Sequence, residues 1–183
     1  ADAATQLASM DVLFLLGADE LDFTAKKAGF TVYIGSHGDA GASAADVILP
    51  GAAYTEKSGT WVNTEGRVQM SARAGFAPGD AREDWAIIRA LSDVLGKKLP
   101  FDSLGALRAK LYAAYPHFAE IDAIKPSSAD EIAALAKKTG ALEKSAFASA
   151  VKDFYLTNPI ARASAVMAEC SALAANNFKV AAE

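Results

Sequence analysis

Residues 11–17 read Asp11-Val-Leu-Phe-Leu-Leu-Gly17, a short continuous apolar run that ends at a glycine. Such a run is typical of a β-strand that is covered on both faces. Two further runs follow, and their β-branched and aromatic residues favour strands: Phe30-Thr-Val-Tyr-Ile34 and Asp46-Val-Ile-Leu49. A helix from about Glu20 to Ala28 connects the first two runs. The sequence therefore predicts a parallel, Rossmann-like sheet with right-handed connections.

A parallel sheet of three such short strands is thin, and its first strand lies close to the beginning of the sequence. Small parallel sheets need cover on both faces and neighbours at their edges. We therefore expect further strands upstream in a longer polypeptide, and we interpret residues 1–78 as a partial α/β domain.

A glycine-rich stretch follows from residue 51 to residue 78. Its two brief β-like runs, Thr60-Trp-Val-Asn63 and Arg67-Val-Gln-Met70, predict an ordered loop or a small hairpin, with Glu65-Gly66 as a turn between the runs. The polar side chains of this stretch have two interpretations. They can line a site, or Asn63, Glu65 and Arg67 can satisfy the backbone groups of the loop. Their spacing does not choose between these.

Residues 79–183 predict a mostly α-helical region. Asp80 and Glu83 have the spacing of a capping box, and Gly96 follows the helix. Its expected buried face consists of Trp85, Ile88, Leu91 and Leu95.

Further helix signals continue toward the C-terminus. We expect a helix from Ser103 to about Pro116, one from Ser128 to Gly140 with Glu131 completing a capping box, and one from Ser145 to Tyr155. Asn158-Pro159 predicts an N-cap and a first helical residue. The last helix then runs to about Ala175, with Ala163, Met167, Cys170 and Ala174 on one face.

Composition excludes several function classes. The hydrophobic content of 52% is enough for a packed core, and the net charge of −4 without a basic stripe argues against nucleic-acid binding. No apolar stretch approaches the roughly 20 residues that span a bilayer. Cys170 is the single cysteine, so an iron–sulfur cluster cannot be held by this chain alone, and His37 and His117 do not make a convincing zinc site with it. We interpret Cys170 as a core residue.

Candidate chemistry is sparse along the chain. The G-x-G-x-x-G pattern of dinucleotide sites is absent after the first strand. Gly35-Ser-His-Gly-Asp-Ala-Gly41 can present backbone amides to an anion. The alternative, which we favour because this loop has no lysine or arginine, is a simple turn between strand and helix. His37 can act as an acid or base, but no neighbouring residue commits it to that role.

A set of short motifs follows one another between residues 45 and 69: Ala45-Asp-Val-Ile-Leu-Pro50, Glu56, Gly59-Thr60, Asn63 and Glu65-Gly-Arg-Val-Gln69. In this order they resemble the molybdopterin oxidoreductase superfamily. Within that superfamily, two further segments look like the large iron–sulfur subunit of respiratory NADH:quinone oxidoreductase, complex I. They are Trp61-Val-Asn-Thr-Glu-Gly-Arg67 and Phe154-Tyr-Leu-Thr-Asn-Pro-Ile-Ala-Arg-Ala-Ser164, the latter followed by Met167-Ala168.

The resemblance implies a C-terminal region of a subunit whose upstream modules hold 4Fe-4S and 2Fe-2S clusters. These clusters carry electrons from NADH and flavin toward quinone. No cluster ligand can be transferred to this chain, because it has no matching cysteine. We therefore expect a structural and assembly role, with no catalytic residue, metal site or cofactor in the chain itself.

Members that bind molybdopterin guanine dinucleotide have a later β-barrel, which the helical region here does not resemble, and complex I subunits are expected to have lost the molybdenum cofactor. If a vestige of the pterin cleft persists, its candidate residues are Gly35, Ser36, His37, Asn63 and Arg67. Two alternatives stay open. One is a domain that binds molybdopterin guanine dinucleotide, and the other is a stand-alone interaction domain that docks through its alanine-rich helices.

Partners and location also follow only from the resemblance. It implies contact with other subunits of the peripheral arm of complex I, without insertion into the membrane. It favours the cytoplasmic side of a bacterial inner membrane over the mitochondrial matrix.

Overall fold

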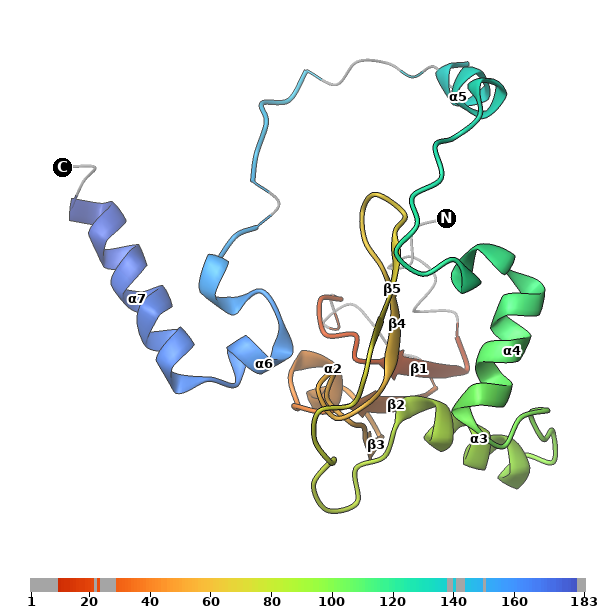
Figure 1. Ribbon diagram of the computed structural model, residues 1–183. Helices are drawn as coiled ribbons and strands as arrows, with labels where there is room; N and C mark the ends of the chain where they lie inside the picture. Colours follow the sequence, from red (N-terminus) through yellow and green to blue (C-terminus); the bar gives the residue numbers. More distant parts are fainter. Residues whose placement is uncertain are drawn as a thin grey trace.

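A computed structural model of the chain describes residues 10–21, 23, 29–137, 140, 144–149 and 151–180. Its N-terminal part holds a parallel sheet in the order β1-β2-β3, formed by Val12–Leu16, Phe30–Gly35 and Val47–Pro50 (Figure 1). The predicted α/β fold with a parallel sheet is confirmed. The helix expected from residue 20 to residue 28 falls largely outside the described residues.

The core of the molecule lies on the middle strand of this sheet. Every residue of β2 from Thr31 to Ile34 is buried, because β2 has a neighbouring strand on each side and cover on both faces. On β1, Leu13 and Leu15 are buried against Tyr33 and Ala42. The alternate side chains Val12, Phe14 and Leu16 are exposed. The expectation of two covered faces thus fits β2, whereas β1 leaves one face open and has no strand beyond it in the described part of the chain.

The short helix α2, Ala40–Ser43, connects β2 to β3. Gly41 and Ala42 of α2 are buried, and Ala42 contributes to the core beside the sheet. This turn from strand to helix agrees with the interpretation that we favoured for residues 35–41.

An antiparallel hairpin follows the sheet. Its strands are β4, Gly59–Val62, and β5, Val68–Ser71. Gly66 has a φ of +83° at the turn, a conformation that glycine adopts without steric cost. Of the two predicted alternatives, an ordered loop or a small hairpin, the structure shows the hairpin, with the predicted glycine at its turn. Val68 is 2% exposed and anchors the hairpin by bridging to Ile121.

The helical region begins with α3, Asp84–Val94, and α4, Leu104–Ala114, followed by the 3-10 turn η1, Pro116–Ala119. The elements that follow are α5 (Ala129–Ala136), η2 (Phe154–Leu156), α6 (Pro159–Arg162) and α7 (Ala165–Val180). Figure 1 shows α5 lying apart from the other elements. All described residues from 122 to 149 are exposed.

Two predicted N-caps, Ser128 and Asn158, are confirmed, and Ser103, where a helix was predicted to start, is an N-cap as well. Ser103 Oγ accepts a hydrogen bond from Ala106 N at 3.1 Å, and Asn158 Oδ1 accepts one from Ala161 N at 2.9 Å. Ser128 and Glu131 form a complete capping box at the start of α5. Each cap satisfies a backbone N–H group that has no partner within its own helix.

The capping box predicted from Asp80 and Glu83 is wrong. Helix α3 begins at Asp84, after Glu83 as an N-cap in extended conformation without a side-chain cap bond. The backbone just before it is committed elsewhere: Arg82 N donates to Pro50 O at 3.1 Å, and Ala52 N donates to Arg82 O at 2.8 Å. These bonds extend the sheet edge, so the helix cannot begin earlier. The expected buried face is half-buried at Trp85, Ile88 and Leu91, but Leu95 is 64% exposed.

The helix predicted from Ser145 to Tyr155 is also wrong. Residues 144–149 and 151–153 are not helical, and only η2 is wound at the end of that range. Ser149 Oγ donates to Val151 O and accepts from Val151 N. Such local bonds compete with helix formation. Phe147 is fully exposed, so burial of its ring does not stabilise a helix here.

The last predicted helix is interrupted. It divides into α6 and α7 because Ser164 begins a new helix: its Oγ accepts from Met167 N and its carbonyl accepts from Ala168 N at 3.1 Å. Cys170 lies on α7 and is half-buried, which is less than a core position.

No helix among the described residues is both long enough and apolar enough to cross a lipid bilayer.

Candidate functional site

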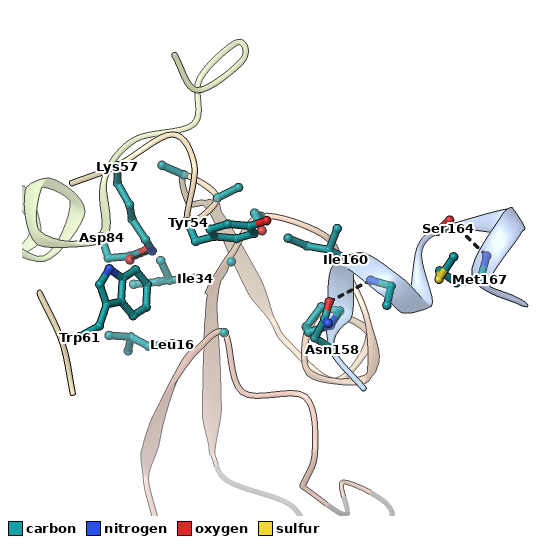
Figure 2. A pocket seen from close by; sticks show the side chains of 17 residues that line it. Leu16, Ile34, Tyr54, Lys57, Trp61, Asp84, Asn158, Ile160, Ser164 and Met167 are labelled. Carbon is teal, nitrogen blue, oxygen red and sulfur yellow. Dashed lines mark hydrogen bonds and ion pairs between the residues drawn. The ribbon is translucent and has the colours of Figure 1, made fainter. Parts of the chain in front are cut away.

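A cavity of about 860 Å³ lies at the carboxyl ends of β1 and β2. In parallel sheets this edge is where ligands generally bind. Figure 2 shows Tyr54 in the middle of the cavity, between Lys57 and Asp84 on one side and Ile160 of α6 on the other. The cavity thus lies between the sheet and the C-terminal helices.

The strand ends form the floor of the cavity through Leu16, Gly17, Ile34 and Gly35. Gly17 ends β1 with a φ of +57°, and its N–H donates to Ile34 O at 2.7 Å. The positive φ turns the chain away sharply after the strand, which keeps the strand ends open.

The wall toward the hairpin carries the charged groups. Lys57 forms an ion pair with Asp84, and both side chains are about a quarter to a third exposed. Asp84 is the first residue of α3, where the helix dipole stabilises a negative charge. Trp61 Nε1 donates to Ser71 Oγ at 2.8 Å. This wall is therefore electrically neutral, and its polar groups are already engaged.

The opposite wall is held in place by Arg162 at the end of α6. Its Nη2 donates to Glu20 Oε1 at 2.9 Å, its Nη1 donates to Leu156 O at 3.1 Å, and its Nε bonds the carboxylate of Asp39. Arg162 lowers the pKa of Glu20, and Glu20 in turn raises the pKa of Arg162. Both acidic partners belong to loops at the strand ends, so Arg162 fastens α6 over the cavity.

We expect Arg162→Ala to lower the free energy of unfolding by about 1–2 kcal/mol, a value reduced for partial solvent exposure. Loss of the guanidinium frees α6 from the two loops, so amide hydrogen exchange in α6 and α7 should rise more than in β2. Urea unfolding and hydrogen-exchange mass spectrometry measure these effects. Lys97→Ala, at an exposed cation, is the control, and equal exchange in both variants would contradict the role of Arg162.

A buried polar cluster supports the floor. Asp19 is 6% exposed and Tyr33 is 1% exposed. Asp19 Oδ2 accepts from the Tyr33 hydroxyl at 2.9 Å, and Asp19 Oδ1 accepts from Gly41 N at 2.8 Å. The cluster joins the loop after β1 to β2 and to α2. Burial, and secondly the hydrogen bond to Asp19, raise the pKa of Tyr33 from 10.0 to about 12.

This shift predicts an alkaline transition. Because the pKa of Tyr33 is higher in the folded chain, its contribution to stability is complete below pH 10 and is lost as the pH rises through about 12. Titration of tyrosinate by ultraviolet absorbance should therefore show a late phase near pH 12, and Tyr33→Phe should abolish it. A late phase that persists in Tyr33→Phe would contradict the assignment.

The structure brings together two of the five cleft candidates, Gly35 and Ser36, which line the cavity. His37 is next to them, with its Nδ1 2.9 Å from Ser36 Oγ, but it does not line the cavity. Asn63 and Arg67 lie at the tip of the hairpin, outside the cavity lining.

Asn63 and Arg67 instead satisfy the backbone. Asn63 Oδ1 accepts from Glu65 N at 3.0 Å and from Arg67 N at 2.9 Å, and Arg67 Nη1 donates to Asp122 O at 3.0 Å. Of the two interpretations of this polar stretch, the geometry favours the structural one for these residues. Glu56 acts in the same way, since its Oε2 accepts from Ala53 N at 2.9 Å.

Sequence reasoning missed several residues that form the cavity walls. Tyr54, Lys57, Asp84 and Ile160 were not singled out, although all four line it. Lys57 and Trp61 lie inside the polar, glycine-rich stretch of residues 51–78. Ile160 lies in the segment from Phe154 to Ser164, where the family resemblance marks the segment but does not mark Ile160 as a site residue. Among the described residues, no group of three or more histidine, cysteine, aspartate or glutamate side chains could hold a metal ion.

Comparison with known proteins places both parts of the chain. Residues 2–94 match the molybdopterin oxidoreductase family, and residues 120–170 match a family formed by the C-terminal region of an NADH-ubiquinone oxidoreductase subunit. The chain is 49% identical over 161 residues to the NADH-ubiquinone oxidoreductase 75 kDa subunit of Reclinomonas americana.

Two further relatives agree. The chain is 48% identical over 166 residues to the mitochondrial NADH-ubiquinone oxidoreductase 78 kDa subunit of Candida albicans, and 44% identical over 168 residues to the mitochondrial NADH dehydrogenase [ubiquinone] iron-sulfur protein 1 of Solanum tuberosum. These matches cover 86–90% of the chain but only 22–23% of the relatives. The chain therefore spans about a quarter of the length of the curated relatives it matches.

Proposed function

Since the chain belongs to the molybdopterin oxidoreductase family and, within it, to the large iron–sulfur subunits of NADH:quinone oxidoreductase, we propose that it acts as a structural and assembly region of such a subunit. In this role it supports electron transfer from NADH to quinone without carrying electrons itself. The sheet and the C-terminal helices provide a scaffold, and the electron carriers belong to the rest of a longer polypeptide.

The charge of the cavity is the observation that carries this proposal. A pterin dinucleotide brings a pyrophosphate, which needs positive charge or free backbone amides around it. Among the described residues, Lys57 and Asp84 are the only charged ones that line the cavity, and they neutralise each other. Gly17 N and Ala52 N, both of residues that line the cavity, already donate to backbone carbonyls. The lining therefore supports a cleft without a bound pterin nucleotide.

Cysteine content supports the same view of the iron–sulfur clusters. One half-buried cysteine on α7 cannot supply the ligands of a 4Fe-4S or 2Fe-2S cluster. We propose that such clusters are bound by upstream modules, and that this chain contacts other subunits of the peripheral arm. We keep the cytoplasmic side of a bacterial inner membrane as the proposed location. The mitochondrial relatives make the matrix side the main alternative.

A second candidate function is binding of molybdopterin guanine dinucleotide. The position of the cavity, at the carboxyl ends of parallel strands, and its volume of about 860 Å³ favour it. Its neutral lining argues against it.

Elemental analysis discriminates between the two functions. We expect iron in the full-length subunit only and molybdenum in neither the full-length subunit nor this chain, with optical spectra that show clusters only in the longer protein. Molybdenum retained in stoichiometric amount by this chain would overturn the structural proposal and establish the pterin site.

A further inference from the structure

A second cavity, of about 360 Å³, lies between the hairpin and helices α3 and α4. It shares Lys57, Trp61 and Asp84 with the first cavity, and its remaining lining comes mainly from Trp85 of α3 and from α4. Three leucines of α4, Leu104, Leu107 and Leu111, make one side of it apolar. Arg108 of α4 lines it as well.

Arg108 has an unsatisfied guanidinium. Its Nε and Nη2 are buried and have no hydrogen-bond partner among the described residues. An arginine side chain stays protonated in proteins, and a buried charged donor without an acceptor is strongly unfavourable. Two other arginines of the chain form ion pairs with carboxylates. Arg89 bonds Asp93 and Asp102, and Arg162 bonds Glu20 and Asp39.

The charges that the described residues place around the second cavity leave one positive charge without a partner. Lys57 and Arg108 are positive, Asp84 is negative, and Asp84 is already paired with Lys57. The indole N–H groups donate to residues outside this lining: Trp61 Nε1 to Ser71 and Trp85 Nε1 to Glu83. Arg108 is therefore the charged residue of this lining that has no ion-pair partner among the described residues.

A carboxylate matches this requirement in charge and in shape. Its two oxygens accept parallel hydrogen bonds from a guanidinium, which explains the frequency of such pairs in recognition sites. The leucines of α4 and the indole of Trp85 leave room for an apolar body beside the carboxyl group. The volume of the cavity is in the range of small-molecule sites.

We propose that the cavity between the hairpin and α4 binds a carboxylate beside the guanidinium of Arg108, with the leucines of α4 around the apolar part of the ligand. The same chemistry serves a free monocarboxylate and the aspartate or glutamate side chain of a neighbouring protein chain. Arg108 lines only the second cavity, so this proposal does not depend on the function of the adjoining first cavity, although the two share part of their lining.

The first test measures binding of benzoate to the purified 183-residue chain by calorimetry, with benzyl alcohol as an uncharged ligand of similar size. We expect saturable benzoate binding that is at least about tenfold tighter than that of benzyl alcohol, as loss of a charge-assisted hydrogen bond implies. Arg108→Met keeps a long unbranched side chain and should remove the preference. Lys110→Met, at an exposed cation of the same helix, should keep it.

A measurement on the unaltered chain covers the case in which Arg108→Met does not fold. Crystals grown or soaked with 4-bromobenzoate should show anomalous bromine density in this cavity, with the carboxyl group facing Arg108. Absence of any benzoate preference in the unaltered chain, or a preference that survives in folded Arg108→Met, would overturn the proposal.

The same titration in the assembled full-length complex distinguishes the two sources of the carboxylate. Benzoate binding that persists after assembly assigns the site to a free monocarboxylate. Benzoate binding that is present in the isolated chain but blocked after assembly assigns it to an acidic side chain of a partner.

Discussion

Asp19→Ala is expected to lower the free energy of unfolding by about 3 kcal/mol, because it leaves two buried donors without acceptors. Those donors are the hydroxyl of Tyr33 and the N–H of Gly41, which bond the two oxygens of the Asp19 carboxylate at 2.9 and 2.8 Å. Tyr33 is only 1% exposed, so water cannot replace the lost acceptor. Urea denaturation followed by circular dichroism measures the change.

A double-mutant cycle gives the matched control for this prediction. Tyr33→Phe removes the orphaned hydroxyl, so Asp19→Ala should cost less in the Tyr33→Phe background than in the unaltered chain. Asp11→Ala changes an exposed aspartate just before β1 and should alter stability by no more than about 0.5 kcal/mol. Equal losses for Asp19→Ala in both backgrounds would show that the Tyr33 hydroxyl is not coupled to Asp19.

The second large effect is expected at Gly41, where even a methyl group has no room. A Cβ atom at this position would lie 2.5 Å from Ala18 O, 2.9 Å from Asp19 Oδ1 and 2.9 Å from Tyr33 Cε2. The closest of these is a backbone atom, which cannot move aside without displacing the loop after β1. We expect Gly41→Ala to destabilise the chain by about 2–4 kcal/mol.

Gly38→Ala is the matched control, because it makes the same substitution three residues earlier, in the loop just before α2. A Cβ at Gly38 would meet only Ala42 Cβ, at an ordinary contact distance of 3.5 Å. This change should leave stability within about 1 kcal/mol of the unaltered chain. Similar urea midpoints for the two variants would refute the close packing inferred at Gly41.

Both predictions concern the support of the cavity and not its lining. Asp19 and Gly41 do not line the 860 Å³ cavity, yet they join the loop after β1 to α2, beside the strand ends that form its floor. A variant that loosens this cluster should therefore also weaken the attachment of α6, since Glu20, next to Asp19, bonds Arg162.

The parts of the fold that the sequence predicted are those in which local pattern and tertiary context agree. The runs that became β1, β2 and β3 are continuous and apolar, and each is short enough to favour a strand over a helix. Ser103, Ser128 and Asn158 cap helices by bonds within three residues, so their neighbours in sequence contain the full information.

The errors arose where distant residues decide the local structure. Arg82 pairs with Pro50 and Ala52, so Asp80 cannot cap α3. Residues 145–149, 151 and 152 have helical composition, but they are exposed, so burial against the rest of the described chain does not stabilise a helix there. Neither the pairing of Arg82 nor the exposure of this segment can be read from the local sequence.

The candidate site was predictable in its position but only partly in its residues. Strand ends in a parallel sheet locate a cavity, and Gly35 and Ser36 follow directly from the end of β2. The walls required contacts between Lys57 and Asp84 and between Asp39 and Arg162, which are far apart in the sequence. Asn63 and Arg67 belong to the family motif but have a structural role in the hairpin. Prediction from the motif alone therefore assigned to the cleft two residues that do not line it.

The bonds of Arg162 also affect the order in which parts of the chain fold during synthesis. They join residues separated by 123 and 142 positions along the chain, and such long-range contacts form late because closing a long loop costs entropy. During synthesis the strands leave the ribosome well before α6 does. The cleft is therefore closed only in a chain that has been translated past residue 162, and a product that stops earlier presents an open cleft to chaperones and proteases.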